Sequence, residues 1–285
     1  MVMATTSADV TITAKQEYAL GYTNSEHERL TRQANRIAPY TERLFREAGI
    51  AAGHRVLDVG SGVGDVSLLL ARIVGPTGEV VGIERDAYSI ARANARIAEA
   101  GLRNVKFLQT DANQMLTEKP FDAVAGRFIL MFLPDPTSVL RQLLQLLKPG
   151  GIVAFQEPSW KPFLAFNAQF PLYSKLLNAI HETFLRSGVN PEMGLDLYRV
   201  FQEVGLPAPT VHMETPLGTG ADFISICSDC VTSVAPMARE HGVPLHELGS
   251  LDTLAARISS EVAAANKVAS LIPLVGVRSR KPMSA

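Results

Sequence analysis

Hydrophobic and polar positions follow two alternating patterns across residues 50–158. Short apolar runs bounded by glycine or charge are typical of buried strands, and longer segments with apolar residues every three or four positions are typical of amphipathic helices. Repeated alternation of the two predicts a parallel, doubly wound α/β sheet, with ligands bound at the carboxyl ends of its strands. The strand-like runs lie in residues 56–59, 80–83, 104–112, 121–136 and 152–156.

The first run leads into three glycines at alternate positions, Gly60, Gly62 and Gly64. They predict a tight strand-to-helix turn, because a residue without Cβ allows close backbone approach. Free N–H groups at the helix start suit a carboxylate or phosphate, although a sharp turn without a ligand is the alternative. The dinucleotide fingerprint G-x-G-x-x-G does not fit, since Asp65 stands where its third glycine would be. This spacing disfavours a nucleotide-cofactor oxidoreductase.

Charged residues fall where the following strands are predicted to end. Glu84 ends the second strand about 20 residues after the glycine turn, where an acid can bind both hydroxyls of a ribose. A solvated charge is the alternative. Asp111 ends the third strand and can accept a hydrogen bond from an adenine amine. Arg127 and Glu157 follow the fourth and fifth strands. These positions converge on one edge of the sheet.

Residues 50–158 resemble the core of class I S-adenosylmethionine-dependent methyltransferases, in the branch of quinone-biosynthesis and natural-product small-molecule enzymes. The glycine loop, Glu84, Asp111 and the turn Lys148-Pro-Gly-Gly match in order and spacing. The resemblance implies a mostly parallel seven-stranded Rossmann-like sheet with a helical cap, S-adenosyl-L-methionine as cofactor and a small-molecule substrate of secondary metabolism. It also implies a methionine site at Asp58 and the loop 60–64, ribose binding by Glu84 and adenine contact by Asp111 and Ala112. The expected cofactor set is Asp58, Gly60, Ser61, Gly62, Gly64, Glu84, Arg85, Asp111, Ala112, Arg127, Tyr22 and Gln33.

Segments outside this core predict a cap over the strand ends. Residues 26–48 have a helical pattern that Pro39 is expected to kink or divide, and in the resembled family such a helix closes over the cofactor. Aromatic residues in 159–188 favour an apolar or aromatic substrate, although cap packing also explains them. The predicted division is 1–49 (helical, part of the cap), 50–158 (cofactor-binding core), 159–190 (cap insertion), 191–218 (core continuation), 219–270 (helical cap insertion) and 271–285 (final strand and tail).

A sulfonium methyl group is already activated, so such an enzyme aligns the nucleophile and excludes water. A hydroxyl or carbon nucleophile also needs a base. Glu157 precedes Pro158 and is expected to face the space between methyl donor and cap, as a base or as a group that orients substrate. His27 and His181 are the other candidate bases. A protein that binds the cofactor without transferring methyl, cyclase-like or structural, stays open.

Composition and charge limit the kinds of partner that we expect for this protein. The 285 residues carry a formal net charge of −1, which gives no support for nucleic acid as a partner. No apolar stretch approaches the roughly 20 residues of a membrane span, and the first residues lack the positive start of a signal peptide, so we expect a soluble cytoplasmic protein, with self-association left open. Cys227 and Cys230 fall on one apolar helix face and predict core thiols, with no metal site, since a structural zinc needs four ligands.

Overall fold

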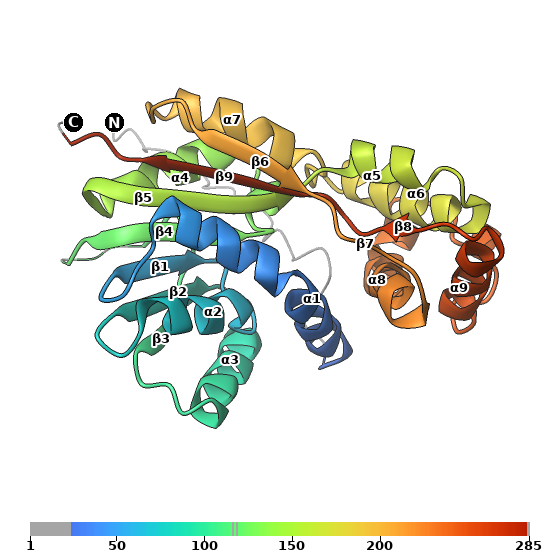
Figure 1. The fold of residues 1–285 in the computed structure, drawn as a ribbon, viewed down its shortest axis with the longest axis horizontal. Coiled ribbons are helices and arrows are strands. Elements are labelled where there is room, and N and C mark those ends of the chain that lie inside the picture. The colour runs from blue at the N-terminus through green and yellow to red at the C-terminus, as the bar shows by residue number, and fades with distance from the viewer. Residues whose placement is uncertain (1–23, 116, 118, 284–285) are drawn as a thin grey trace, which may run out of the picture.

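The structure is a computed structural model that describes residues 24–115, 117 and 119–283 (Figure 1). Its large sheet has seven strands in the order β3-β2-β1-β4-β5-β9-β6. The neighbours from β3 to β5 pair in parallel, and β9 runs antiparallel to both β5 and β6. The predicted mostly parallel α/β sheet is therefore confirmed. The strands are β1 (Arg55–Val59), β2 (Glu79–Glu84), β3 (Val105–Gln109), β4 (Phe121–Arg127), β5 (Leu147–Pro158), β6 (Thr210–Glu214) and β9 (Leu274–Arg280).

Alternate residues of the central strands pack against helices on opposite faces of the sheet. On one face Val56 packs with apolar side chains of α1 and α2, and on the other Leu57 belongs to a cluster that includes α4 and α7. Both faces are covered, so the strands read as nearly continuous apolar runs. The helices of this core are α1 (Asn24–Ala48), α2 (Asp65–Val74), α3 (Ala87–Glu99), α4 (Pro136–Gln145) and α7 (Met193–Glu203).

A helical lobe lies beside the carboxyl end of β5 (Figure 1). It is built from the segments that follow β5 and β6, and the short antiparallel pair β7–β8 runs along it. The carboxylate of Glu261 on α9 accepts hydrogen bonds from the first free amides of α6, at Leu172 and Tyr173, and so caps that helix. The lobe consists of α5 (Trp160–Asn167), α6 (Pro171–Arg186), β7 (Leu217–Gly218), α8 (Ala221–Glu240), η2 (His246–Leu248), α9 (Leu254–Ala264) and β8 (Ala269–Ser270).

Helix α1 connects the core to the lobe. Its C-terminal part buries Leu44 and Phe45 against the sheet, while its N-terminal half packs against α8. Pro39 was expected to kink or divide this segment, and the division is wrong, because α1 is one helix from 24 to 48 with Pro39 inside it. Pro39 and Asn35 are both exposed, so the carbonyl that loses its amide partner lies on the solvent side. No helix among the described residues is long and apolar enough to cross a membrane.

Candidate active site

The turn between β1 and α2 places backbone against the space at the strand ends. Gly60, Gly62 and Gly64 all have positive φ, at +66°, +51° and +85°. A Cβ on Gly60 would lie 2.5 Å from Cδ1 of Ile129, so this position needs glycine for its contact as well as for its backbone angle. The loop therefore passes directly beneath residues 128–133, which follow β4.

A cavity enclosing about 780 Å³, when its part open to solvent is counted, lies between this loop, the ends of β2 and β3, and α1; we call it the first cavity. His27 and Leu30 of α1 and Phe128 and Phe132 after β4 also line it. It brings together six of the predicted cofactor residues, namely Gly60, Gly62, Glu84, Arg85, Asp111 and Ala112.

Glu84 holds the loop that forms this cavity. One carboxylate oxygen, Oε2, accepts a hydrogen bond from the amide of Gly62 at 3.0 Å. The other, Oε1, accepts from the amides of Arg85 and Asp86 at 2.7 and 3.0 Å. A carboxylate has about four acceptor positions, so one position on Oε2 stays available to a ligand. Glu84 is thus both a structural anchor and a lining residue.

Asp111 lies across the mouth of the first cavity from Arg85. Its Oδ2 is 3.8 Å from Nη1 of Arg85, and the two side chains are 31% and 46% exposed. Such an exposed pair contributes little to stability, so either group can exchange its partner for a ligand at small cost.

His27 enters the first cavity from the N-terminal turn of α1. Its Nε2 lies 3.2 Å from Oγ of Ser89 on α3, and its ring stacks on Tyr88 with centroids 5.2 Å apart. Its Nδ1 is buried and has no hydrogen-bond partner among the described residues. Burial lowers the pKa of His27, and the nearby carboxylate of Asp86 opposes this. The imidazole is therefore neutral near pH 7.

Two charged residues expected at the cofactor lie on the α1 side of the sheet. The carboxylate of Asp58 is fully buried and accepts a hydrogen bond from Oγ of Ser67 at 2.5 Å, and burial raises its pKa to about 7. Arg127 donates from Nη1 to Oγ1 of Thr41 at 3.0 Å, and burial lowers its pKa. Neither is among the described residues that line the first cavity.

The other predicted cofactor residues are placed as follows. Ser61 is buried and donates its amide to the carbonyl of Ile83 at 3.0 Å, which fixes the loop to β2. Gly64 caps the start of α2. Gln33 lines a different cavity, described next. Tyr22 lies outside the described residues.

A second cavity enclosing about 770 Å³, when its part open to solvent is counted, lies between α1, the residues after β4 and the helical lobe. Leu30, Phe128 and Phe132 line both cavities, so the two cavities adjoin at these three side chains. The walls of the second cavity are mainly apolar, and its polar lining comes from α1 and α8. Its aromatic lining consists of Phe128, Phe132, Trp160, Phe163 and Phe184.

The structure corrects the expected orientation of Glu157. Its carboxylate is completely buried and faces the backbone after β4: Oε1 accepts from the amides of Ile129 and Leu130 at 2.9 Å each, and Oε2 from Met131 at 3.4 Å. Burial raises the pKa of Glu157 to about 7, against the opposing effect of these hydrogen bonds. Among the described residues, Glu157 lines neither cavity, because the amides at the start of η1 (Leu130–Phe132) draw its side chain inward.

His181 also lies away from both cavities. Its Nε2 is 3.9 Å from Oε1 of Glu192, and its ring lies 5.9 Å from that of Trp160. Burial lowers its pKa. In this geometry it packs behind the aromatic wall of the second cavity instead of facing it.

Both cysteines are free and line the second cavity. Burial raises the pKa of Cys227 to about 12 and also raises the pKa of Cys230, so both are neutral thiols. Within the described chain, no group of three or more His, Cys, Asp or Glu side chains is placed to hold a metal ion.

Several lining residues have no counterpart in the sequence-based expectations. Phe128 has an unusual left-handed backbone with φ +55°, and like Phe132 it lines both cavities. Ser89, which lies beside His27 and lines the first cavity, is also absent from those expectations. Phe128 and Phe132 both fall in the short segment after β4, a strand that ends at the ligand edge, and this was the signal that could have identified them.

Comparison with known proteins agrees with this geometry. A family model described as "Methyltransferase domain" matches residues 50–205. Demethylmenaquinone methyltransferase from Staphylococcus aureus (strain JH9) is 30% identical over 178 residues, covering 58% of this chain and 73% of that protein. The chain therefore belongs to the class I S-adenosylmethionine-dependent methyltransferases of the small-molecule kind, and it is an enzyme of that family.

Solved structures share the fold. A Bacillus halodurans C-125 protein proposed to be a methyltransferase superposes with a TM-score of 0.57 at 22% identity, covering 84% of this chain and 97% of that one. The [4+2]-cyclase SpnF superposes with a TM-score of 0.52 at 21% identity, covering 87% and 81%. The fold is thus shared by proteins with different named activities.

Proposed function

We propose that the first cavity binds S-adenosylmethionine and that the second binds a small apolar or aromatic molecule that accepts its methyl group. The observation that carries this proposal is that the two cavities adjoin: Leu30, Phe128 and Phe132 line both, so two bound ligands would lie next to each other. A two-substrate transfer needs both partners held at near-attack distance, and adjoining cavities provide that.

The residues of the first cavity fit the methyl donor. Glu84 keeps an acceptor position for a ribose hydroxyl, and the carboxylate of Asp111 suits an adenine amine. At Gly62, which lines this cavity, an added Cβ would meet no atom within 4 Å, so the loop leaves open space there. S-adenosylmethionine supplies a methyl group activated by a positive sulfur, so the protein's part is to bind, orient and exclude water. We infer that Asp58 and Arg127 support the loop and strand ends from behind and do not touch the cofactor.

The second cavity supports an apolar or aromatic substrate, because five aromatic side chains form much of its wall. An apolar lining of this kind keeps water away from the atoms that react when the methyl group passes to a substrate in the second cavity. In this proposal the protein acts on a metabolite in the cytoplasm and not on nucleic acid, in keeping with its net charge of −1.

We assign the two remaining chemical roles by position. His27 is the one of the three expected bases that lines a cavity, and as a neutral imidazole it can take a proton from a hydroxyl or carbon nucleophile. Glu157 instead positions the segment 129–131, in which Ile129 lines the first cavity and Met131 lines the second. A substrate that is already nucleophilic would need neither group as a base.

Incubation with methyl-deuterated S-adenosylmethionine and a panel of aromatic phenols, amines and activated carbon acids tests the proposal. We expect S-adenosylhomocysteine and a labelled product with at least one compound, and saturable binding of S-adenosylmethionine, but not of NAD, by calorimetry. Cofactor binding without labelled product from a broad panel would favour the cyclase-like or structural alternative. Binding of NAD alone would overturn the assignment of the first cavity.

A further inference from the structure

The side chain of Gln33 has a defined orientation at the edge of the second cavity. Nη1 of Arg29 lies 2.6 Å from its Oε1. A guanidinium has only donors, so the atom that it contacts must be the amide oxygen. The amide nitrogen of Gln33 therefore points away from Arg29, with two N–H donors. Since Gln33 is half-buried and lines the second cavity, a ligand there meets a donor.

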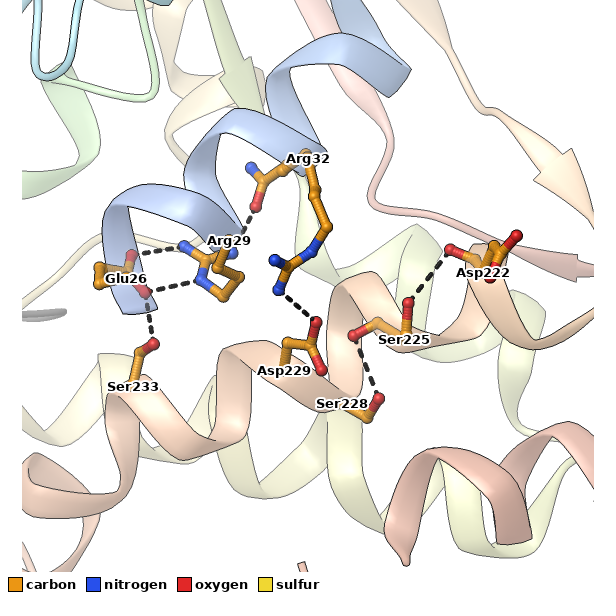
Figure 2. A network of polar contacts seen from close by, with 9 residues as sticks. Glu26, Arg29, Arg32, Asp222, Ser225, Ser228, Asp229 and Ser233 are labelled. Carbon is orange, nitrogen blue, oxygen red and sulfur yellow. Dashed lines mark hydrogen bonds and ion pairs between the residues drawn. The ribbon is translucent and has the colours of Figure 1, made fainter. Parts of the chain in front are cut away.

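The charges near this donor neutralise each other. Arg29 donates from Nε and Nη2 to the two carboxylate oxygens of Glu26 at 2.7 and 2.6 Å, and Ser233 of α8 also donates to that carboxylate (Figure 2). The side chains of Arg29 and Glu26 are 4% and 1% exposed. A buried pair of this kind presents no net charge to a ligand, and its carboxylate already has its donors.

The remaining lining adds no ionised group. Cys227 and Cys230 are neutral thiols, and the other described lining residues are apolar or aromatic. A ligand that fills this cavity thus finds mainly apolar walls, with N–H donors that include the amide of Gln33 and the indole of Trp160. An ammonium group would lose its hydration without finding a carboxylate, which is costly in such a site.

We propose that Gln33 is a specificity-determining residue, which selects apolar ring compounds carrying a neutral hydrogen-bond-accepting oxygen, such as a ketone, ether or phenol, and rejects ammonium compounds. This inference rests on the proposed function only in taking the second cavity as the substrate site. It names the polar group that the substrate must carry, and the residue that recognises it.

The chain carries its own reporter for the test, because Trp160 is its only tryptophan and lines the second cavity. Incorporation of 5-fluorotryptophan gives one fluorine resonance, which can be titrated by NMR with indane, 1-indanone and 2-aminoindane. These compounds share one ring system and differ in lacking a polar group, carrying an accepting oxygen, or carrying an ammonium group. We expect 1-indanone to bind about fivefold or more tighter than indane, as one neutral hydrogen bond predicts, and 2-aminoindane to bind weakest.

Substitutions on α1 then test whether Gln33 causes the preference for 1-indanone over indane. Gln33→Leu is expected to bring the 1-indanone to indane ratio close to one while indane affinity is kept. Gln33→Glu replaces donors with a carboxylate and is expected to improve 2-aminoindane binding relative to 1-indanone. Asn35→Leu is the matched control, because Asn35 is an exposed amide on the same helix outside this cavity, and the ratio should not change.

The outcomes separate this inference from the proposed function. If indane and 1-indanone bind the unaltered protein equally well, or if Gln33→Leu leaves their ratio unchanged, the role of Gln33 is overturned while the cavity still binds ring compounds. If none of the three compounds moves the fluorine resonance, the second cavity is not a site for such molecules, and the substrate assignment of the proposed function fails as well.

Discussion

The backbone amide of Gly62 donates a hydrogen bond to Oε2 of Glu84 across 3.0 Å, and this contact joins the glycine loop to the end of β2. The other carboxylate oxygen is held by the amides of Arg85 and Asp86. A single side chain thus anchors the loop, lines the first cavity and keeps one acceptor position on Oε2. We therefore expect cofactor binding and loop stability to be coupled through Glu84.

Glu84→Ala tests this coupling. Removing the carboxylate leaves three backbone amides without their acceptor, so we expect the cofactor-free protein to lose about 1 kcal/mol of stability, with a melting temperature a few degrees lower. Affinity for S-adenosylmethionine should fall about tenfold or more, because the ribose loses a charged acceptor. Calorimetric titration and thermal melts with and without cofactor measure both effects. An unchanged melting temperature would show that the amides find water instead, and unchanged affinity would remove Glu84 from the ribose site.

Gly60 and Gly62 offer a matched comparison within the loop. Both have positive φ, so alanine at either costs roughly 1 kcal/mol. At Gly60 the new methyl group would also overlap Ile129, whereas at Gly62 it meets nothing within 4 Å and enters the space beside the loop. We expect Gly60→Ala to lose a further 1–3 kcal/mol or so by chemical denaturation. Gly62→Ala should stay close to the backbone cost and instead weaken cofactor binding. Equal losses of stability would contradict the close approach of Gly60 to Ile129.

Much of the sheet and the first cavity could be predicted from the sequence, because both depend on local patterns. Apolar runs bounded by glycine or charge identify the parallel strands, and the rule that ligands bind at their carboxyl ends identifies Gly60, Glu84 and Asp111. These residues reach the cavity because they lie at the end of a strand or within two residues after it. Their position along the chain is enough to place them.

The orientation of side chains at the ends of β4 and β5 could not be predicted in this way. Neighbouring residues of a strand point to opposite faces, so position at a strand end does not say whether Glu157 or Arg127 faces the ligand. That depends on the segment after β4, whose left-handed residue Phe128 follows no sequence pattern. The position of Gln33 in a cavity depends on a contact between segments that are far apart in the sequence, since the second cavity exists only where α8 packs against α1.

Two ion pairs where α1 meets α8, one within α1 and one between the two helices, should contribute very differently to stability. Glu26 is almost fully buried with Arg29 and Ser233, whereas Arg32 pairs with Asp229 at 2.9 Å with the two side chains 56% and 35% exposed (Figure 2). Glu26→Gln leaves a buried guanidinium without its counter-charge, and we expect a loss of about 3–5 kcal/mol. Arg32→Gln should cost less than about 1 kcal/mol. Urea denaturation measures both, and similar losses would contradict the burial that distinguishes the pairs.

Glu157→Gln separates a base from a positioning residue. A general base predicts a loss of roughly 10²–10⁴ in turnover. Our assignment predicts a smaller loss, since the glutamine oxygen can still accept from Ile129 and Leu130 while its NH₂ faces the weaker contact with Met131. Turnover at saturating cofactor, with any substrate found by the panel, makes this comparison. A loss above 10² with normal melting would restore Glu157 as a base.

The pH dependence of stability provides a second test of Glu157, independent of any substrate. Burial raises its pKa from 4.5 to about 7, so between these values the folded protein keeps a proton that the unfolded chain has released. Stability therefore falls as pH rises through this window, by up to about 1.4 kcal/mol per pH unit, and the full contribution of Glu157 to stability is present below pH 4.5.

Three other buried groups also make stability depend on pH. Asp58, whose pKa is raised, acts in the same direction as Glu157, whereas His27 and His181, whose pKa values are lowered, act in the opposite direction. These three groups remain in Glu157→Gln, so the difference in unfolding free energy between the unaltered protein and the variant isolates Glu157. We expect the unfolding free energy of the unaltered protein to fall relative to that of the variant from pH 5 to pH 7. Above pH 7 the difference between the two should stay constant. A difference that does not change with pH would mean that Glu157 is ionised throughout and that its three backbone hydrogen bonds outweigh its burial.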